Sequence, residues 1–554
     1  MRAYIFHYHL RPGGVTGVIT TSLRALAGEL STVEEFIVVT GEEPSASVRK
    51  EIEGLADILV IEEIGYLSLA QLSEPPRPSP MPAGMSREEK QEYRSRQVAA
   101  LTSRIEAQLI RNCDPSRSLW WVHNHHLGKN PVFTETLLKI GEEHPQLPLL
   151  LQIHDFPEEA RYANLRFLNL IVHRNPYPVR SKAVFAVINS RDLRHLREAG
   201  VPESRLRLLP NPIPPPPDRE APRPAAPAGQ RRAPGDETIR DRLRSAYIRS
   251  FPLFDPQAPI ALYPVRTIRR KNVMEAAFLL AALGRPVNLV VTLPGVSQQE
   301  RNYSAMVEHA YREGIIRGLW GIGTTVEEHG ISFEELLSTA DLFVSSSVQE
   351  GFGFQYIDSL AKGRPLIARD LPVLEDLRPL LQGAHFYREL QVPTSTPSLS
   401  DVRPMLRMKY QQRIEQVEPT LPDAVIAQME EEAAALVSAE SVDFSYLMPQ
   451  MQYSYLKDLQ EDSFRADVAA LNPQLMRGVE QAISSPPQLR SEAALAEVEE
   501  RFGFRAYRQR VEEILDSFAT VQTEEPAAPA AAEEVQKRLI ERFAGLDKLR
   551  LLFE

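Results

Sequence analysis

The sequence predicts an α/β protein with two doubly wound, Rossmann-like domains that face each other across a cleft, followed by a helical C-terminal extension. Three observations support this prediction: the length of the chain, an alternation of short apolar runs with helical stretches, and a proline-rich segment that divides those runs into two sets. With 554 residues, the chain is too long for one hydrophobic core. Short apolar runs between helices are typical of parallel sheets buried on both faces.

Each set of apolar runs is expected to form one parallel sheet. The runs before the proline-rich segment are residues 3–6, 35–40, 58–61, 118–123, 147–154 and 184–189. The runs after it are residues 260–263, 287–292, 342–345 and 366–368. Ligands of such sheets bind at the carboxyl ends of the strands, so polar residues that follow these runs are candidate site residues.

Proline-rich stretches with almost no large apolar residues set the expected domain boundaries, because they cannot form a core element. The expected divisions are an N-terminal Rossmann-like domain at 1–215, a Pro/Arg-rich linker at 216–250, a second Rossmann-like domain at 251–390, a helical extension with a closing helix at 391–521, and an Ala/Pro/Glu spacer with a terminal helix at 522–554.

Composition and charge argue against several classes of protein. A hydrophobic fraction of 43% and a charged fraction of 25% are those of an ordinary globular protein. No run approaches the roughly 18–20 apolar residues of a membrane span. The net charge of −11 argues against general nucleic-acid binding. The single cysteine, Cys113, cannot form an internal disulfide, and no signal-peptide pattern is found, so a cytoplasmic protein is expected.

The most informative segment runs from Ser345 to Asp370, SSSVQEGFGFQYIDSLAKGRPLIARD. A strand-like run ends in a loop that holds Glu350 and two glycines, and a helical run follows. Glycines let backbone amides approach a ligand, and the N–H groups of a helix N-terminus suit a pyrophosphate. An acid in the loop can reach sugar hydroxyls, and Asp358 in the helix can reach a ribose diol. A tight strand–helix turn with one cap and one surface acid is the alternative.

This segment resembles the donor-site signature of retaining glycosyltransferases of family four (group 1), which have the GT-B fold. The family pattern is PS-x-x-EGFG-x-x-x-x-E-A-M-A-x-G-x-P-V-I-A, and this chain matches it at Ser346, Glu350, Gly351, Phe352, Gly353, Ala361, Gly363, Pro365, Ile367 and Ala368. The chain departs from the pattern at Asp358, where the family has glutamate. The resemblance implies that Glu350 contacts the donor sugar and that Asp358 contacts the ribose.

A second block resembles the segment of the family that binds the diphosphate, G-R-x-x-x-x-K-G. Arg266 and Lys271 keep the spacing of the family, whereas Val265 and Asn272 replace its two glycines. The resemblance implies that Arg266 and Lys271 grip the donor diphosphate, and cations at a strand end suit the charge that grows on a leaving group. A solvated basic loop is the alternative, and the neighbouring arginines could share the role.

Three features nearer the N-terminus extend the resemblance. Gly13–Gly14 resembles the first glycine loop of the family, which approaches the donor phosphates. His123 and His125 follow a strand and are expected to line the acceptor side of the cleft; matching zinc ligands are lacking, so a metal site is not expected. His154 ends another strand, and the resemblance places it near the donor sugar and leaving group, with Asp155 on the acceptor side.

The resemblance implies an enzyme, a hexosyltransferase that moves a hexose from a nucleotide-sugar to an acceptor hydroxyl with retention at the anomeric carbon. The N-terminal domain would serve the acceptor and the second domain the donor, with UDP-glucose as the first expectation and GDP-mannose as the second. His154, Glu350, Arg266 and Lys271 are expected to carry the catalysis. No cofactor or metal is expected, because cations and backbone amides can stabilise the leaving diphosphate.

The acceptor and the oligomeric state stay open. Basic residues after His154 could favour an anionic acceptor such as a sugar phosphate, or could equally be surface charge: Arg161, Arg166, Arg174, Arg180 and Lys182. An epimerase or phosphorylase on the same two-domain fold would need residues that we do not find. A non-catalytic GT-B-like protein that binds a sugar nucleotide or acts as a scaffold is the alternative, since Asp358 and the loop beside Arg266 depart from the family pattern.

Overall fold

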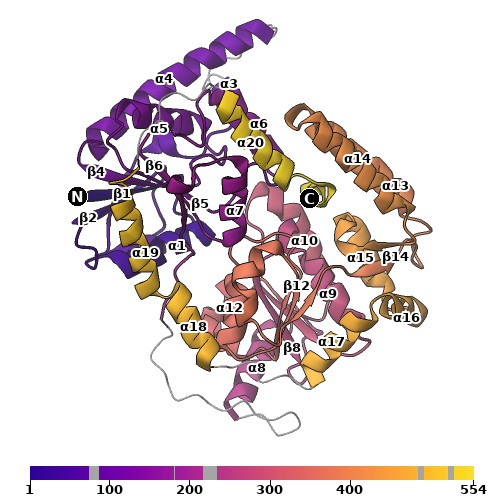
Figure 1. Cartoon of the computed structure of the whole chain (residues 1–554). Coiled ribbons are helices and arrows are strands. Elements are labelled where there is room, and N and C mark those ends of the chain that lie inside the picture. Colours follow the sequence, from indigo (N-terminus) through magenta and orange to yellow (C-terminus); the bar gives the residue numbers. More distant parts are fainter. Residues whose placement is uncertain (74–86, 180, 216–233, 485–491, 522–529, 554) are drawn as a thin grey trace, which may run out of the picture. The chain divides into compact units, whose positions relative to one another are not determined.

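The structure, a computed structural model, describes residues 1–73, 87–179, 181–215, 234–484, 492–521 and 530–553 (Figure 1). The chain divides into two compact units. Unit 1 comprises Met1–Pro216, Thr420–Pro422 and Glu499–Ala544, and unit 2 comprises Pro217–Pro419, Asp423–Val498 and Gly545–Glu554. Each unit is built around one large parallel sheet with helices alternating along the chain, so the predicted fold class of two doubly wound domains with C-terminal helices is confirmed.

The sheet of unit 1 has seven strands in the order β3-β2-β1-β4-β5-β6-β7, and all of its pairings are parallel. Its strands are β1 (Arg2–His7), β2 (Glu35–Thr40), β3 (Asp57–Val60), β4 (Ser118–His123), β5 (Leu149–Ile153), β6 (Ala183–Val187) and β7 (Leu206–Leu208). The chain winds outward from β1 in one direction and then from β4 in the other. The topological switch point, where ligands of such sheets bind, therefore lies at the carboxyl ends of β1 and β4.

Helices cover both faces of this sheet because alternate residues of each strand point to opposite sides. In β4, Trp120 belongs to one buried cluster and Trp121 to the other. The helices of unit 1 are α1 (Gly14–Leu26), α2 (Ala46–Ile52), α3 (Leu69–Ser73), α4 (Arg87–Cys113), α5 (Pro131–Glu143), α6 (Tyr162–Ile171), α7 (Ser190–Ala199), α19 (Phe504–Ser517) and α20 (Ala530–Phe543). The late helix α19 lies beside α1 (Figure 1), where Tyr507 and Ser22 share a buried hydrogen bond of 2.8 Å.

The sheet of unit 2 has six parallel strands in the order β10-β9-β8-β11-β12-β13. These are β8 (Ile260–Arg266), β9 (Asn288–Leu293), β10 (Gly318–Trp320), β11 (Leu342–Ser345), β12 (Leu366–Arg369) and β13 (His385–Tyr387). The first strand of this sheet, β8, pairs with β9 on one side and with β11 on the other. The switch point of unit 2 therefore lies at the carboxyl ends of β8 and β11.

The helices of unit 2 include one that falls inside the predicted linker at 216–250. They are α8 (Pro234–Tyr247), α9 (Val273–Ala281), α10 (Gln298–Arg312), α11 (Phe333–Ser338), α12 (Phe354–Ala361), α13 (Arg403–Val417), α14 (Asp423–Ser438), α15 (Pro449–Asp458), α16 (Asp462–Leu471), α17 (Pro473–Ser484) and α21 (Leu546–Leu549). The helix α8 forms because Ile239, Leu243 and Tyr247 recur every four residues and give it an apolar face, on which Leu243 is fully buried. Residues 216–233 of the predicted linker lie outside the described residues.

The segment expected as a helical extension, residues 391–521, is divided between the two units. Its first part, to Val498, belongs to unit 2, where α15 packs against α9, and a small antiparallel pair joins β14 (Gln391–Pro393) to β15 (Ser441–Asp443). The helix α18 (Glu492–Phe502) crosses to unit 1, to which α19 and α20 belong. Residues 522–529 of the predicted spacer lie outside the described residues. Among the helices that the structure describes, none has the length and apolar character of a membrane span.

Candidate functional site

The two segments that were expected to bind the donor, residues 266–271 and 345–370, meet at the switch point of unit 2. The chain leaves β8 through a short turn that ends at Lys271 and enters α9 after Asn272. Tyr263 on β8 donates its hydroxyl to the carbonyl oxygen of Lys271 at 2.7 Å. The loop after β11 is tied to the same turn, since Ser346 donates to the carbonyl oxygen of Asn272 at 2.9 Å and Val348 N–H donates to that of Arg270 at 2.8 Å. Hydrogen bonds to the carbonyl oxygens of this turn therefore fix the position of one segment against the other.

Lys271 and Glu350 are in direct contact at this junction. Lys271 Nζ lies 2.5 Å from Glu350 Oε1, and Gln355 Nε2 donates to the same oxygen at 3.0 Å. Burial acts to raise the pKa of the Glu350 carboxyl, but the charges of Lys271 and Arg270 outweigh it and hold the pKa below its ordinary value. Glu350 is therefore a buried carboxylate whose acceptor oxygens are oriented by a lysine and an amide.

Arg266, the other cation assigned to the diphosphate, forms a different ion pair. Its Nη1 lies 3.6 Å from Glu300 Oε1 on α10, and the two side chains are 30% and 21% exposed. Glu300 also closes the capping box of α10 with Ser297, which fixes its position. Arg266 and Lys271 thus lie at the same strand end but pair with separate carboxylates.

The glycine-rich loop leads directly into α12. Gly353 caps this helix with φ 89°, a left-handed conformation, and a Cβ atom there would lie 2.4 Å from the ring of Tyr356. Glycine is therefore required at 353 by both the backbone and the packing. Asp358 lies on α12, where burial raises the pKa of its carboxyl to about 6, with a further increase from the charge of Glu334. Burial and a neighbouring carboxylate thus place the titration of Asp358 close to neutral pH.

Asn272 occupies a position where the family has glycine, and the structure shows how it serves there. Its φ of 50° and ψ of 44° are left-handed, a conformation that asparagine tolerates better than most residues. Its side chain accepts hydrogen bonds from Arg269 at 2.9 Å and from Gln452 at 3.0 Å, and donates one to Glu275 at 2.7 Å. Asn272 therefore supplies the conformation of glycine and also anchors the turn.

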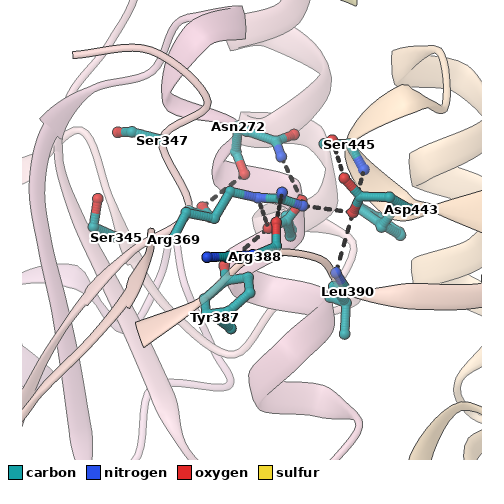
Figure 2. A network of polar contacts seen from close by, with 12 residues as sticks. Asn272, Ser345, Ser347, Arg369, Tyr387, Arg388, Leu390, Asp443 and Ser445 are labelled. Carbon is teal, nitrogen blue, oxygen red and sulfur yellow. Dashed lines mark hydrogen bonds and ion pairs between the residues drawn. The ribbon is translucent and has the colours of Figure 1, made fainter. Parts of the chain in front are cut away.

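Behind this turn lies a buried network of charges that the sequence did not reveal. Arg369 at the end of β12 binds Glu275 on α9 through two hydrogen bonds, of 2.6 and 2.8 Å, and Asp443 through a third, of 2.6 Å (Figure 2). Arg550, near the C-terminus, donates to Ser445, which in turn donates to Asp443 at 2.6 Å. The network joins the turn that holds Lys271 to the first part of the extension and to the C-terminal segment of unit 2.

The histidines predicted in unit 1 separate into two groups. His123 Nδ1 lies 2.8 Å from His154 Nε2, and their rings are stacked with centroids 5.1 Å apart. His7, which the sequence analysis did not single out, joins them edge-on at 6.4 Å from His123. Burial lowers the pKa of His154 to about 4 and that of His123 well below its ordinary value, so both rings are neutral at neutral pH.

His125 and Asp155 have partners of their own. His125 Nε2 lies 2.7 Å from the carbonyl oxygen of Pro176, and burial lowers the pKa of His125 to about 4. Asp155 forms an ion pair of 3.0 Å with Arg161. Of the three residues expected on the acceptor side, His123 is hydrogen-bonded to His154 through its side chain. Within the described ranges, no group of three or more His, Cys, Asp or Glu side chains is arranged to hold a metal ion.

The first glycine loop of unit 1 is not explained by packing within the protein. Gly13 is extended, a conformation open to any residue, and precedes α1. A Cβ atom built on Gly14 would meet no heavy atom of the described chain within 4 Å. The backbone conformation at 13 and the packing within the described chain at 14 therefore do not require glycine.

No family model matches the chain. Over 555 residues, covering 99% of both proteins, the chain is 26% identical to mannosylglucosyl-3-phosphoglycerate synthase of Petrotoga mobilis. This match confirms the predicted resemblance to glycosyltransferases. Among solved structures, the chain is similar to HepE of Anabaena in complex with UDP, with a TM-score of 0.47, 12% identity and coverage of 93% of this chain and 100% of that one. It is also similar to sucrose-phosphate synthase of Thermosynechococcus elongatus, with a TM-score of 0.44, 12% identity and coverage of 94% and 100%.

Proposed function

We propose that the protein is a glycosyltransferase that moves a hexosyl group from a nucleotide-sugar to an acceptor hydroxyl with retention of configuration. The observation that carries this proposal is the contact between Lys271 and Glu350 at the switch point of unit 2, beside the glycine-rich start of α12. The cation and the backbone amides at this strand end suit the diphosphate of a donor, and the buried carboxylate suits its sugar.

Lys271 and the N-terminus of α12 would stabilise the leaving nucleoside diphosphate. The ammonium of Lys271 has three N–H donors, so it can keep its bond to Glu350 and still reach a phosphate oxygen. The first turn of α12 adds backbone N–H groups that carry partial positive charge. Arg266 supplies a second cation at the same strand end. Charge that develops on the diphosphate as the glycosidic bond breaks is stabilised most by such fixed groups.

Glu350 would orient the sugar, and Asp358 the ribose. The carboxylate of Glu350 has acceptor capacity beyond its bonds to Lys271 and Gln355, so it can accept hydrogen bonds from sugar hydroxyls. Asp358, with a pKa of about 6, can accept from one ribose hydroxyl when ionised and donate to another when protonated. The shorter aspartate therefore retains the chemistry that the family obtains from glutamate.

His154 is assigned a polarising role in unit 1 rather than that of a base. A general base works best when its pKa is near the operating pH, whereas the pKa of His154 is about 4. Its hydrogen bond to His123 fixes the orientation of the neutral ring. The acceptor proton then passes to the leaving diphosphate on the same face of the sugar, which keeps the configuration at the anomeric carbon. No metal or cofactor takes part in this proposal.

The name of the Petrotoga mobilis relative suggests which donor and acceptor to propose. Mannosylglucosyl-3-phosphoglycerate contains a mannosyl group, a glucosyl group and a phosphoglycerate. We propose accordingly that the donor carries mannose, which favours GDP-mannose over the UDP-glucose that was first expected. The acceptor is proposed to be an anionic glycoside, of the kind that this name describes.

A thermal-shift series with UDP-, GDP- and ADP-sugars tests the proposal. A ligand that binds the folded state alone raises its stability, so one donor is expected to raise the Tm of the wild type. The increase is expected to vanish in Glu350→Gln and to persist in Glu480→Gln, which makes the same chemical change at an exposed position of α17 in the same unit. Failure of every donor to stabilise the wild type would contradict the proposed function.

A further inference from the structure

Basic side chains lie near Tyr66 in unit 1, and together with it they form what we name the Tyr66 cluster: Tyr66, His9, Arg11, Lys129 and Arg161. His9 Nε2 lies 2.8 Å from the hydroxyl oxygen of Tyr66. Lys129 Nζ lies 5.1 Å from the centroid of the Tyr66 ring, and the guanidinium carbon of Arg11 lies 6.0 Å from it. Burial raises the pKa of the Tyr66 hydroxyl, while the positive charges of Arg161 and Arg11 act to lower it.

The cluster lies at the edge of the sheet where ligands bind. Arg11 follows β1, Lys129 follows β4 and Arg161 follows β5, so all three cations come from loops at the carboxyl ends of strands. The strands β1 and β4 form the switch point of this sheet. Topology thus brings together side chains that are far apart in the sequence, at the edge where a doubly wound sheet receives its ligand.

Hydrogen bonds to the backbone hold the loops of the cluster together. Leu67 N–H donates to the carbonyl oxygen of Lys129 at 2.9 Å. Asn130 Nδ2 donates to the carbonyl oxygens of Glu63 and Gly65, at 2.8 and 2.7 Å. The segment that carries Tyr66 is therefore fastened to the loop that carries Lys129, and the cluster is preorganised.

The two arginines are oriented by carboxylates that do not exhaust their hydrogen-bonding capacity. Arg11 binds Glu42 through two bonds of 2.6 Å, and Arg161 lies 3.0 Å from Asp155. Each guanidinium has five N–H donors. Burial lowers the pKa of His9, which favours its neutral ring, so the positive charges of the cluster are those of Arg11, Lys129 and Arg161. Such a set suits a bound anion.

Among the basic residues that the sequence suggested for binding an anionic acceptor, Arg161 differs from the others in its position. Arg174 is bound by Glu135 and Glu142 on α5. Lys182 directly precedes β6, which places it at the amino edge of the sheet. Arg166 lies on the exposed side of α6, and Arg180 lies outside the described residues. Arg161 is thus the one of these that joins the Tyr66 cluster.

We propose that the Tyr66 cluster binds the anionic group of the acceptor, a phosphate or a carboxylate carried by a glycoside. The inference rests on the proposed function, because it assigns this group to the acceptor of the transfer reaction. Charge-assisted hydrogen bonds from Lys129, Arg11 and Arg161 would hold the anion, and the hydroxyl of Tyr66 would add a neutral donor.

Calorimetric titration of the full chain tests this site with three probes: inorganic phosphate, glycerol 3-phosphate and glycerate. The first two carry a phosphate and the third a carboxylate, so the probes distinguish the two sources of charge. Lys129→Met and Arg11→Met are each expected to weaken binding by about ten-fold or more, the scale of one hydrogen bond to a charged group. Arg49→Met removes an exposed arginine of α2, paired with Glu43, and is expected to leave the affinity unchanged.

Three outcomes would overturn the inference: no binding of any probe to the wild type, equal binding to the wild type and both cluster variants, or equal weakening by Arg49→Met. Donor binding is measured separately by thermal shift in the same proteins. A donor that binds while no anion binds rejects the site and leaves the proposed function standing. An anion that binds at the cluster while no donor binds rejects the transferase and, with it, the assignment of this anion to an acceptor.

Discussion

Replacing Arg369 by methionine is expected to destabilise unit 2 more than any surface change. The guanidinium of Arg369 is buried and binds Glu275 twice, Asp443 once and the carbonyl oxygen of Arg388 once. Methionine fills similar space but offers no donor. Glu275, which is 0% exposed, would lose its ion pair with Arg369, while Asp443 would keep Ser445 and Arg550.

The expected loss follows from the burial of Glu275. Removing one partner of a buried ion pair typically costs about 3–5 kcal/mol, because the other charge stays in a medium of low polarity. Burial already raises the pKa of Glu275, against the effect of Arg369, so losing the arginine raises this pKa further. A raised pKa means that the folded variant holds a proton that the unfolded chain releases. The deficit relative to the wild type is therefore largest near pH 7 and shrinks as the pH falls toward about 5.

The loss in free energy of unfolding is measured by hydrogen exchange of peptides from α9, which reports on unit 2 alone. A local measurement is needed because the two units need not unfold together. Arg388→Met is the matched control, since Arg388 is 88% exposed and its removal is expected to cost less than about 0.5 kcal/mol. If Arg369→Met lowers the free energy of unfolding by less than about 1 kcal/mol, or if the deficit grows as the pH falls, the buried ion pair does not stabilise unit 2 as expected.

Three further predictions concern single residues. Asn272→Ala is expected to lower the free energy of unfolding by about 2 kcal/mol or more, because alanine disfavours the left-handed backbone and cannot make the buried hydrogen bonds. Asn272→Gly is expected to lower it by less, because glycine keeps the conformation, and equal urea midpoints of the two variants would contradict this. Tyr507→Phe is expected to destabilise unit 1 by about 1–2 kcal/mol through its lost bond to Ser22, and an unchanged Tm would argue against that bond. Burial raises the pKa of Cys113 to about 12, so a thiol reagent is expected to modify it only on unfolding, and rapid modification of the native protein would show that it is accessible.

The sequence predicted the central strands well because each is a short apolar run with a single interpretation. Residues 118–123 were expected as a strand and form β4 with the same bounds, and residues 147–154 contain β5 at Leu149–Ile153. The short strands β10 and β13 were not predicted, since three residues each give no periodicity that can be distinguished from a loop. The helix α8 was assigned to a linker because the prolines beside it concealed its apolar face.

The parts of the candidate site that lie within one short segment could be predicted from the sequence. Contacts between residues far apart in the sequence could be predicted less well. The glycine-rich loop and the spacing of Arg266 and Lys271 were visible as motifs. The contact of Lys271 with Glu350 depends on the order of the strands, which spacing along the chain does not show. Arg369 and Glu275 are 94 residues apart, so no local sequence motif indicates that they pair.

The measurement that tests the central claim most directly is a transfer assay followed by mass spectrometry and proton NMR. The protein is incubated with UDP-glucose or GDP-mannose and with glucosyl-3-phosphoglycerate, an anionic glycoside of the class proposed for the acceptor. The account predicts release of the nucleoside diphosphate, an acceptor that gains one hexose with the anomeric configuration of the donor, and loss of both in Glu350→Gln but not in Glu480→Gln. Donors that bind but remain intact with this acceptor, or equal transfer by Glu350→Gln, would contradict the account.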